Sequence, residues 1–111
     1  IGLYGKMPWE GSRIENSYSV IVDGAQHWLV CGGQVGSGMA ISFDPTKNLP
    51  SSGNGGAIVS YNKQLIDFAR DQINNGKYFK HSDVGTNSRM SEVDCAQMMV
   101  KTKYINQMQI V

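Results

Sequence analysis

The sequence has little charge, few cysteines and no long apolar run, and each shortage narrows the possible functions. Charged residues make up 17% of the 111 residues, against about 25% in typical domains. The net charge is +1 and the basic residues do not cluster, so we expect no nucleic-acid partner, because phosphate-binding proteins carry a basic patch. No stretch approaches the roughly 18 apolar residues that span a bilayer, so we expect no transmembrane segment.

Enough apolar sequence is present for one packed core. Hydrophobic residues make up 41% of the chain, which argues against disorder. A chain this short does not hold two independent cores, so we expect a single domain over residues 1–111. Thirteen glycines exceed the usual share and predict many turns.

Two cysteines and a processed-looking start favour a secreted protein. Cys31 and Cys95 allow one pairing, and we expect a disulfide, although two buried free thiols fit the same sequence. The chain begins at Ile1 without an initiator methionine, which suggests that an N-terminal signal or pro-segment has been removed. We therefore predict an extracellular location.

Alternating apolar residues predict a small antiparallel sheet after an irregular N-terminal arm over residues 1–16. Residues 17–32 read as a hairpin with Asp23 and Gly24 in its turn, a residue pair that tolerates the positive φ of tight turns. Residues 38–43 read as a third strand that places Met39 and Phe43 on one face.

A polar loop and an amphipathic helix follow these strands. Residues 46–57 are rich in Gly, Ser and Asn and predict a crossover without regular structure. Ser60 or Asn62 is expected to cap a helix that runs to about Asn74 and packs on one face of the sheet. Its apolar residues recur at helical spacing; they are Tyr61, Leu65, Ile66, Phe68, Ala69 and Ile73. Asn75 and Gly76 supply a left-handed stop.

The C-terminal third is ambiguous. Residues 77–81 suit a short strand, and residues 107–111 suit an edge strand. Ser91 is placed to cap a helix near 91–97, whereas alternation over 98–105 suits a strand; both elements also fit in succession.

No residue set matches a known catalytic or ligand-binding spacing, so we expect no metal and no cofactor. The histidines and cysteines lack the close pairing of zinc sites. Gly33 to Gly38 precedes a strand rather than a helix, unlike a phosphate-binding loop. The alternative is acid–base chemistry by His27 and His81, as in a small ribonuclease, with Lys80 or Arg70 as the cation.

The order of these features resembles the fungal killer-toxin family and the secreted effectors built on its pattern. The corresponding pieces are residues 35–43, the loop, residues 64–76, Cys95 and a strand beginning near Met98. The resemblance implies an α+β fold, a compact two-layer α/β sandwich with an antiparallel sheet of about five strands and one or two helices on one face. It also implies a non-enzymatic secreted toxin or effector.

Three functional hypotheses follow. The leading hypothesis is a secreted virulence-type protein that binds an unknown protein or cell-surface target. The second is a secreted ribonuclease or other hydrolase that uses His27 and His81. The third is an inhibitor or immunity-type protein whose 46–57 loop enters a cleft of its partner.

Overall fold

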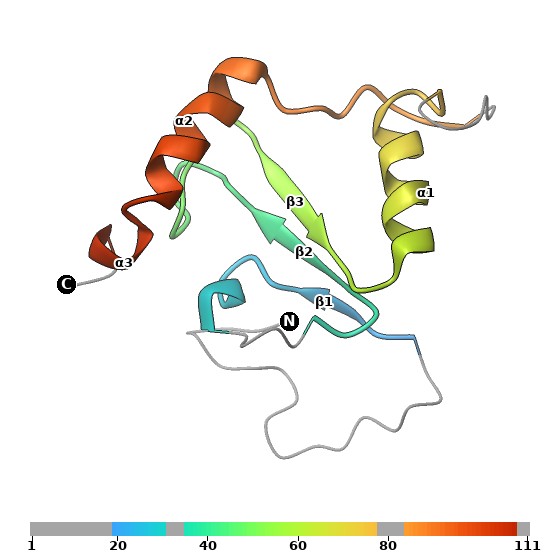
Figure 1. Cartoon of the computed structure of the whole chain (residues 1–111), viewed down its shortest axis with the longest axis horizontal. Helices are drawn as coiled ribbons and strands as arrows, with labels where there is room; N and C mark the ends of the chain where they lie inside the picture. Colours follow the sequence, from blue (N-terminus) through green and yellow to red (C-terminus); the bar gives the residue numbers. More distant parts are fainter. Residues whose placement is uncertain (1–18, 31–34, 78–83, 109–111) are drawn as a thin grey trace, which may run out of the picture.

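The computed structural model describes residues 19–30, 35–77 and 84–108, which form a three-stranded sheet with helices at its sides (Figure 1). The elements are β1 (Ile21–Asp23), η1 (Trp28–Val30), β2 (Gly38–Ser42), β3 (Gly56–Val59), α1 (Lys63–Ile73), α2 (Glu92–Thr102) and α3 (Ile105–Met108). Of these, η1 is a short 3-10 helix. Across the described residues, no helix is both long and apolar enough to cross a membrane.

The sheet is mixed and has β2 in its centre. β1 runs parallel to β2, with Val22 opposite Met39. β3 runs antiparallel to β2, with Ala57 opposite Ile41. The predicted antiparallel sandwich of about five strands is therefore wrong, because the described part of the chain has three strands and one of its two strand pairs is parallel.

Asp23 and Gly24 end β1 without forming the expected hairpin. The Gly24 N–H donates to the Ala40 carbonyl at 2.8 Å, so the chain continues along β2 instead of turning back. The N–H groups of His27 and Trp28 then donate to the Gly24 carbonyl and close a turn that leads into η1. The second strand expected over 27–31 is thus a turn and a 3-10 helix as far as residue 30. Parallel strands need such a crossover, whereas a hairpin joins only antiparallel ones.

One face of the sheet carries the main core. Val22, Val35 and Met39 are buried there, and Val35 comes from the crossover between β1 and β2. Val20, Trp28 and Ile41 pack around them. The prediction of a strand over 38–43 is confirmed, since β2 occupies residues 38–42 and buries Met39.

Helix α1 matches its sequence pattern at both ends. The Asn62 side-chain oxygen accepts hydrogen bonds from the N–H groups of Gln64 and Leu65, at 2.9 and 3.3 Å, which satisfies donors that a helix start leaves free. Asn75 and Gly76 follow the helix with φ of 58° and 69°, the left-handed conformation that stops a helix. Leu65 packs on the sheet at Gly38, where an added Cβ would lie 3.1 Å from it.

The C-terminal segment is helical, as one of the two predicted alternatives had it. Ser91 caps α2 by accepting the Asp94 N–H at 3.1 Å, and α2 and α3 together cover most of residues 92–108. The alternative strand over 98–105 is therefore wrong. The expected edge strand over 107–111 begins inside α3 and otherwise lies outside the described residues. The irregular arm over 1–16, and all but Lys77 of the strand expected over 77–81, also lie outside them.

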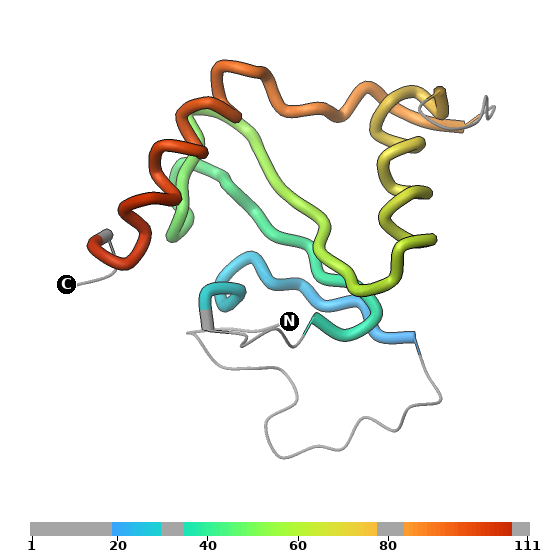
Figure 2. Tube along the Cα trace, in the orientation of Figure 1, coloured from blue at the N-terminus to red at the C-terminus, as the bar shows by residue number. Residues whose placement is uncertain are grey.

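The segment from residue 84 to residue 90 leads from the end of α1 towards α2 (Figure 2). Its backbone is bonded to the last turn of α1: the Thr86 N–H donates to the Gln72 carbonyl at 2.7 Å, and the Ser88 N–H donates to the Ile73 carbonyl at 3.0 Å. Gly85 makes this contact possible, because a Cβ there would lie 2.4 Å from the backbone nitrogen of Gly76.

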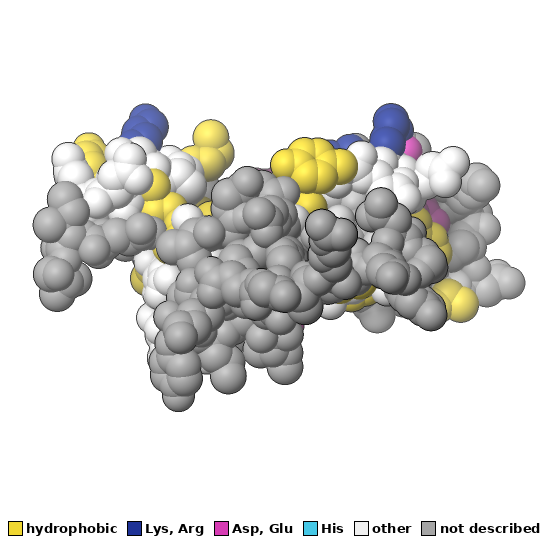
Figure 3. Space-filling view, turned by 90° about the horizontal axis from the view of Figure 1, so that it is seen from below, with side chains coloured by type: hydrophobic (Ala, Val, Ile, Leu, Met, Phe, Trp, Pro, Cys, Tyr) yellow, Lys and Arg dark blue, Asp and Glu magenta, His cyan; other side chains and the backbone are white. Residues whose placement is uncertain are grey.

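Much apolar surface stays uncovered. Where the residues are described, the face in Figure 3 shows hydrophobic side chains beside a few basic and acidic ones. Two residues of the apolar side predicted for this helix are exposed: Tyr61, which precedes α1, is 83% exposed, and Phe68 within α1 is 65% exposed. α1 therefore covers the sheet only in part. Val93 and Val100 of α2 are also exposed. Such a surface is typical of protein that packs against further polypeptide.

Replacing Gly85 by alanine is expected to destabilise the fold by about 1–3 kcal/mol, because the new Cβ meets backbone atoms that side-chain rotation does not move. Gly53→Ala is the matched control: no atom lies within 4 Å of its added Cβ, so this variant should unfold like the wild type or slightly later. Urea unfolding followed by circular dichroism gives both free energies. Equal midpoints for the two variants would contradict the proposed backbone contact.

Candidate active site

The parallel pairing of β1 and β2 gathers polar side chains at one edge of the sheet. Because both strands run in the same direction, Asp23 at the end of β1 and Ser42 at the end of β2 lie towards the same edge. In open α/β sheets, ligands bind beyond the carboxyl ends of the strands. This edge, together with the loop that follows β2, is therefore the candidate site.

Asp23 presents a carboxylate to solvent at this edge. One of its oxygens accepts the Ala25 N–H at 3.1 Å, which fixes the side chain at the start of the turn. The next residue, Gly24, is buried, and a Cβ on it would lie 2.5 Å from the sulfur of Met39. Since Met39 is itself only 2% exposed, a larger residue at position 24 would displace the core beside Asp23.

Asp44 organises the loop that follows β2. Its carboxylate oxygen Oδ1 accepts the Thr46 N–H at 3.0 Å and the Thr46 hydroxyl at 2.7 Å. Its carbonyl accepts the Lys47 N–H at 2.9 Å, so residues 44–47 form a closed turn. The Thr46 N–H lowers the pKa of the Asp44 carboxyl below its usual value, helped by the Thr46 hydroxyl and by the charge of Lys47.

Lys47 differs from the other lysines of the described residues. Lys63 pairs with Asp67, and Lys101 donates to the Pro50 carbonyl. Lys77 and Lys103 are exposed. Lys47 is half-buried, and no described residue accepts a hydrogen bond from its ammonium. The Lys47 ammonium is therefore partly buried in the fold and is not hydrogen-bonded to any described residue.

The far end of the Lys47 loop is tied to α2. Leu49 is buried, with 2% of its surface exposed. Beyond it, the Pro50 carbonyl accepts the Lys101 ammonium, and the Ser52 hydroxyl donates to Gln97. The loop is thus held by the Asp44 turn on one side and by α2 on the other.

His27 and Trp28 lie behind the edge rather than in it. His27 is 1% exposed. Among the described residues, its two ring nitrogens and the indole nitrogen of Trp28 have no hydrogen-bond partner. Trp28 packs edge-on against Phe43, with ring centroids 6.3 Å apart. His27 is therefore a buried turn residue that does not face solvent, which does not suit the acid–base role considered for it.

The other residues singled out from the sequence do not join this site. His81 and Cys31 lie outside the described residues. Cys95 lies on α2 as an exposed free cysteine, so the expected disulfide is not formed at this residue and that prediction is corrected.

Sequence reasoning missed Asp23 and Lys47 as candidates. The sequence pattern places Asp23 in a hairpin turn and Lys47 in a surface loop. A signal was present, since a carboxylate and an amine each follow an apolar strand. This signal predicts a shared site only if the two strands are parallel, because only then do their carboxyl ends lie at the same edge of the sheet.

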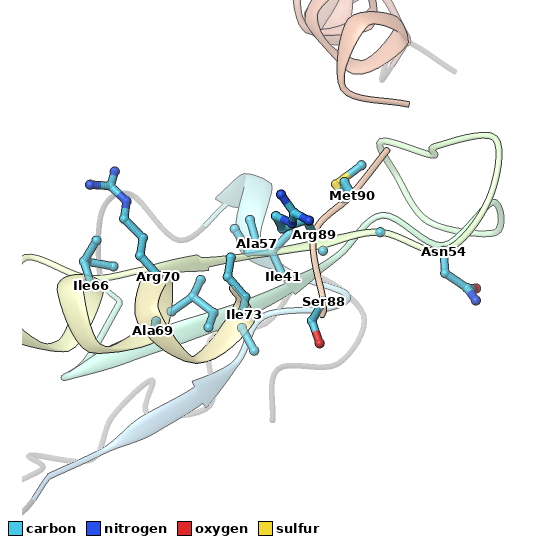
Figure 4. Close-up of a pocket in the computed structure, with 14 residues that line it drawn as sticks. Ile41, Asn54, Ala57, Ile66, Ala69, Arg70, Ile73, Ser88, Arg89 and Met90 are labelled. Atoms are coloured by element: carbon cyan, nitrogen blue, oxygen red, sulfur yellow. The ribbon is translucent and has the colours of Figure 1, made fainter. Parts of the chain in front are cut away.

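A pocket of about 700 Å³ lies elsewhere in the molecule and shares no residue with the polar edge (Figure 4). β2, β3, α1 and the segment around residue 89 line it. Its apolar lining includes Ile41, Ala57, Ile66, Ala69, Ile73 and Met90. Arg70 and Arg89 also line it, and no acidic residue does.

Known proteins resemble most of this chain. A model of the DegT/DnrJ/EryC1/StrS aminotransferase family matches residues 22–110. A pleiotropic regulatory protein from Geobacillus stearothermophilus is 35% identical over 86 residues, or 75% of this chain and 23% of that protein. A dTDP-3-amino-3,4,6-trideoxy-alpha-D-glucose transaminase from Streptomyces venezuelae is 32% identical over 80 residues, or 68% of this chain and 21% of that protein.

Solved structures agree with the sequence matches. DesV of S. venezuelae, solved in complex with a ketimine intermediate, superposes with a TM-score of 0.59 at 34% identity and covers 66% of this chain. A DegT DnrJ EryC1 StrS aminotransferase from Brucella abortus superposes with a TM-score of 0.61 at 29% identity. In both cases the match covers 20% of the solved chain. The present chain thus spans about a fifth to a quarter of the length of these proteins.

These matches overturn the functional predictions made from the sequence. The resemblance to fungal killer toxins is wrong, because residues 22–110 match an aminotransferase family instead. The expected non-enzymatic toxin or effector is wrong for the same reason, as are the ribonuclease or hydrolase and the inhibitor alternatives. The extracellular location stays a prediction.

Thr46→Val is expected to raise the pKa of Asp44 part of the way towards 3.8, because it removes the hydroxyl donor and keeps the N–H donor. The depressed pKa means that Asp44 stabilises the folded chain above the pKa of the unfolded state, and that this stabilisation is lost as the pH falls through the folded pKa. A carbon-13 NMR titration of the carboxyl group measures the shift. Thr86→Val, in another segment, is the control, and an unchanged Asp44 titration in Thr46→Val would contradict the hydrogen-bond assignment.

Proposed function

The chain belongs to the DegT/DnrJ/EryC1/StrS aminotransferase family, and we propose that it supplies part of the cofactor site of a pyridoxal-phosphate-dependent aminotransferase that acts on sugars. The match over residues 22–110 carries this proposal. The substrate class is taken from the S. venezuelae relative, which is a transaminase of a dTDP-linked amino sugar. A nucleotide-linked keto or amino sugar is therefore the expected substrate of the whole enzyme.

The polar edge offers the groups that pyridoxal phosphate requires. Enzymes of this kind hold the cofactor through a lysine amine and place an acidic or basic partner at its pyridine nitrogen. Lys47 supplies an amine that has no hydrogen-bond acceptor among the described residues, and Asp23 supplies an exposed carboxylate at the same edge. The donor set therefore fits the cofactor, in place of the expectation of no cofactor that the sequence alone suggested.

Each residue has a distinct part in this scheme. When bound, pyridoxal phosphate supplies an electron sink that lets an amino group move between an amino acid and a carbonyl carbon. Lys47 would hold the cofactor through Nζ and, once an incoming amine has displaced it, would carry protons at that atom. The Asp23 carboxylate would face the pyridine nitrogen and favour its protonated form, because an adjacent negative charge stabilises the positively charged ring.

The fold around these residues supports their roles by limiting movement. The Asp44 turn fixes the backbone on the N-terminal side of Lys47. Leu49 and the bond from Lys101 to Pro50 fix the C-terminal side. An amine held on a rigid loop keeps its geometry better than one on a mobile loop, which is a general requirement of catalytic groups.

A chimera tests the proposal, since the present chain spans only a part of its relatives. Residues 22–110 would replace the matching segment of the S. venezuelae transaminase. We expect the chimera to retain pyridoxal phosphate through dialysis, and borohydride reduction followed by mass spectrometry to place the pyridoxyl mass on Lys47. Lys47→Arg should remove this mass and Lys63→Arg should keep it. A folded chimera that carries the cofactor on another lysine would overturn the assignment.

Asp23→Ala in the same chimera is expected to weaken cofactor retention by about 10- to 100-fold, the usual cost of losing a hydrogen bond to a charged group. Asp67→Ala on the exposed side of α1 is the control, since Asp67 pairs only with Lys63 among the described residues. Equilibrium dialysis with pyridoxal phosphate measures the affinity. Equal affinities for the two variants would show that Asp23 is not the partner of the pyridine nitrogen.

A further inference from the structure

Two asparagines of the described residues are followed by glycine: Asn54 precedes Gly55, and Asn75 precedes Gly76. The side chain of an asparagine reaches the backbone N–H groups that follow it. A glycine at the next position has no side chain to obstruct that approach, and it leaves the backbone free to rotate. The remaining asparagines of the described residues precede Leu, Lys, Asn, Ser or Gln. Both Asn-Gly pairs therefore have the local sequence in which the glycine nitrogen can attack the amide carbon of the asparagine, but their surroundings in the fold differ.

The backbone nitrogen that follows Asn75 is held in a hydrogen bond. The Gly76 N–H donates to the Asp71 carbonyl at 2.7 Å, and the Asn75 N–H donates to the Thr86 carbonyl at 2.9 Å. Gly76 is buried, and a Cβ on Gly85 would lie 2.4 Å from its nitrogen, so the neighbouring segment packs directly on it. Reaction at Asn75 therefore requires the end of α1 to open first, and such opening is rare in a bonded segment.

The backbone nitrogen that follows Asn54 is not held in this way. In the register of β2 and β3, Phe43 lies opposite Gly55, and the Phe43 N–H donates to the Gly55 carbonyl at 2.8 Å. A complete antiparallel pair would exchange a second bond, from the Gly55 N–H to the Phe43 carbonyl. That carbonyl instead accepts the Ser51 N–H at 2.8 Å. The Gly55 N–H consequently donates to no described residue.

The Asn54 side chain has room to rotate. Asn54 is exposed, and Figure 4 shows its side chain pointing away from the other labelled residues. No described residue forms a hydrogen bond with its side-chain amide. Gly53 before it has open space around it, with no atom within 4 Å of an added Cβ. The peptide planes beside Asn54 can therefore rotate with little resistance, since glycine tolerates conformations that other residues avoid.

We propose that Asn54 is a site of spontaneous deamidation, because the fold exposes this Asn-Gly pair and protects the other. The Gly55 backbone nitrogen loses its proton to hydroxide and attacks Cγ of Asn54. An N–Cγ bond forms, the Cγ–Nδ2 bond breaks, and ammonia leaves with a proton taken from water. Water then opens the resulting cyclic imide at either carbonyl, which yields aspartate or isoaspartate. The net reaction consumes a water and releases an ammonia, with no oxidant or reductant.

Deamidation would change the segment that joins the Lys47 loop to β3. Arg70 and Arg89 are the charged residues that line the pocket of about 700 Å³, and Asn54 lines it too. Conversion of Asn54 would therefore give this lining its first carboxylate. Isoaspartate would also route the main chain through its Cβ, which lengthens the backbone directly before β3. This chemistry depends on neither the family membership nor the cofactor assignment, so the cofactor experiments do not bear on it.

Trypsin cuts after lysine and arginine, and so places Asn54 in peptide 48–63 and Asn75 in peptide 71–77. The full chain is incubated at mildly alkaline pH in oxygen-18 water, and its peptides are sequenced by tandem mass spectrometry. We expect Asn54 to convert about tenfold or more faster than Asn75, a factor for which the loss of one hydrogen bond before reaction accounts. Incorporation of oxygen-18 shows that the conversion took place during the incubation and not during digestion.

The same incubation in concentrated urea supplies the reference for the unfolded chain. Both asparagines then have the same free Asn-Gly chemistry, so their rates should become similar. Circular dichroism shows that the chain is folded without urea. A ratio of the two rates that is the same with and without urea would overturn the proposal. A folded chain in which Asn75 converts first, or in which Asn54 does not convert, would overturn it as well.

Two substitutions within peptide 48–63 test which residue reacts. Asn54→Gln keeps an amide but requires a larger ring for the same attack, so conversion in this peptide should be lost. Asn48→Gln is the matched control, because Asn48 is also exposed but precedes a leucine, and this variant should convert like the wild type. Continued conversion of the peptide in Asn54→Gln would show that another residue reacts, and the assignment to Asn54 would be wrong.

Gly85→Ala tests why Asn75 is protected. The added Cβ meets the backbone at Gly76 and should loosen the end of α1, so we expect conversion of Asn75 to accelerate about fivefold or more. Conversion of Asn54 should stay fast. Gly53→Ala adds a Cβ in open space and should leave Asn75 as slow as in the wild type. An unchanged Asn75 rate in Gly85→Ala would contradict protection by the packing at Gly76.

Discussion

The parallel alignment of β1 with β2 is the constraint on which the rest of this structure depends. It requires the long crossover that buries Val35 against Val22 and Met39. It also brings the ends of both strands to one edge, so that Asp23 and the Lys47 loop face the same region. With these strands antiparallel, the same residues would lie at opposite ends of the sheet, and the groups proposed to bind the cofactor would not come together.

Local structure could be predicted from the sequence where it depends on residues within one continuous segment. The α1 helix, its Asn62 cap and its left-handed end at Asn75 and Gly76 depend on residues within a single stretch. β2 was readable for the same reason. The helix at Ser91 was one of two predicted alternatives, because its apolar residues, of which only Met98 is buried, provide little periodic contrast.

The pairing of strands that lie far apart in the sequence could not be predicted in this way. Asp23 and Gly24 have the composition of a hairpin turn, and only the bond from Gly24 to Ala40 shows that the chain continues across the sheet. β3 was hidden in a segment rich in Gly, Ser and Asn because it is short and uncharged. Element order alone then suggested the wrong family, since a few strands and a helix in succession occur in unrelated folds. The candidate site was missed with it, because Asp23 and Lys47 acquire meaning only from strand direction.

Because the Lys47 loop is attached to α2, substitutions on this helix can alter the position of the Lys47 amine. Lys101 and Gln97 hold Pro50 and Ser52 from a helix whose opposite surface faces outward. Any neighbour that docks on that outer surface and shifts the helix along its axis would pull on the loop and re-aim the lysine amine. Remote substitutions on α2 therefore have a mechanical route to the proposed cofactor site, although α2 contributes no residue to it.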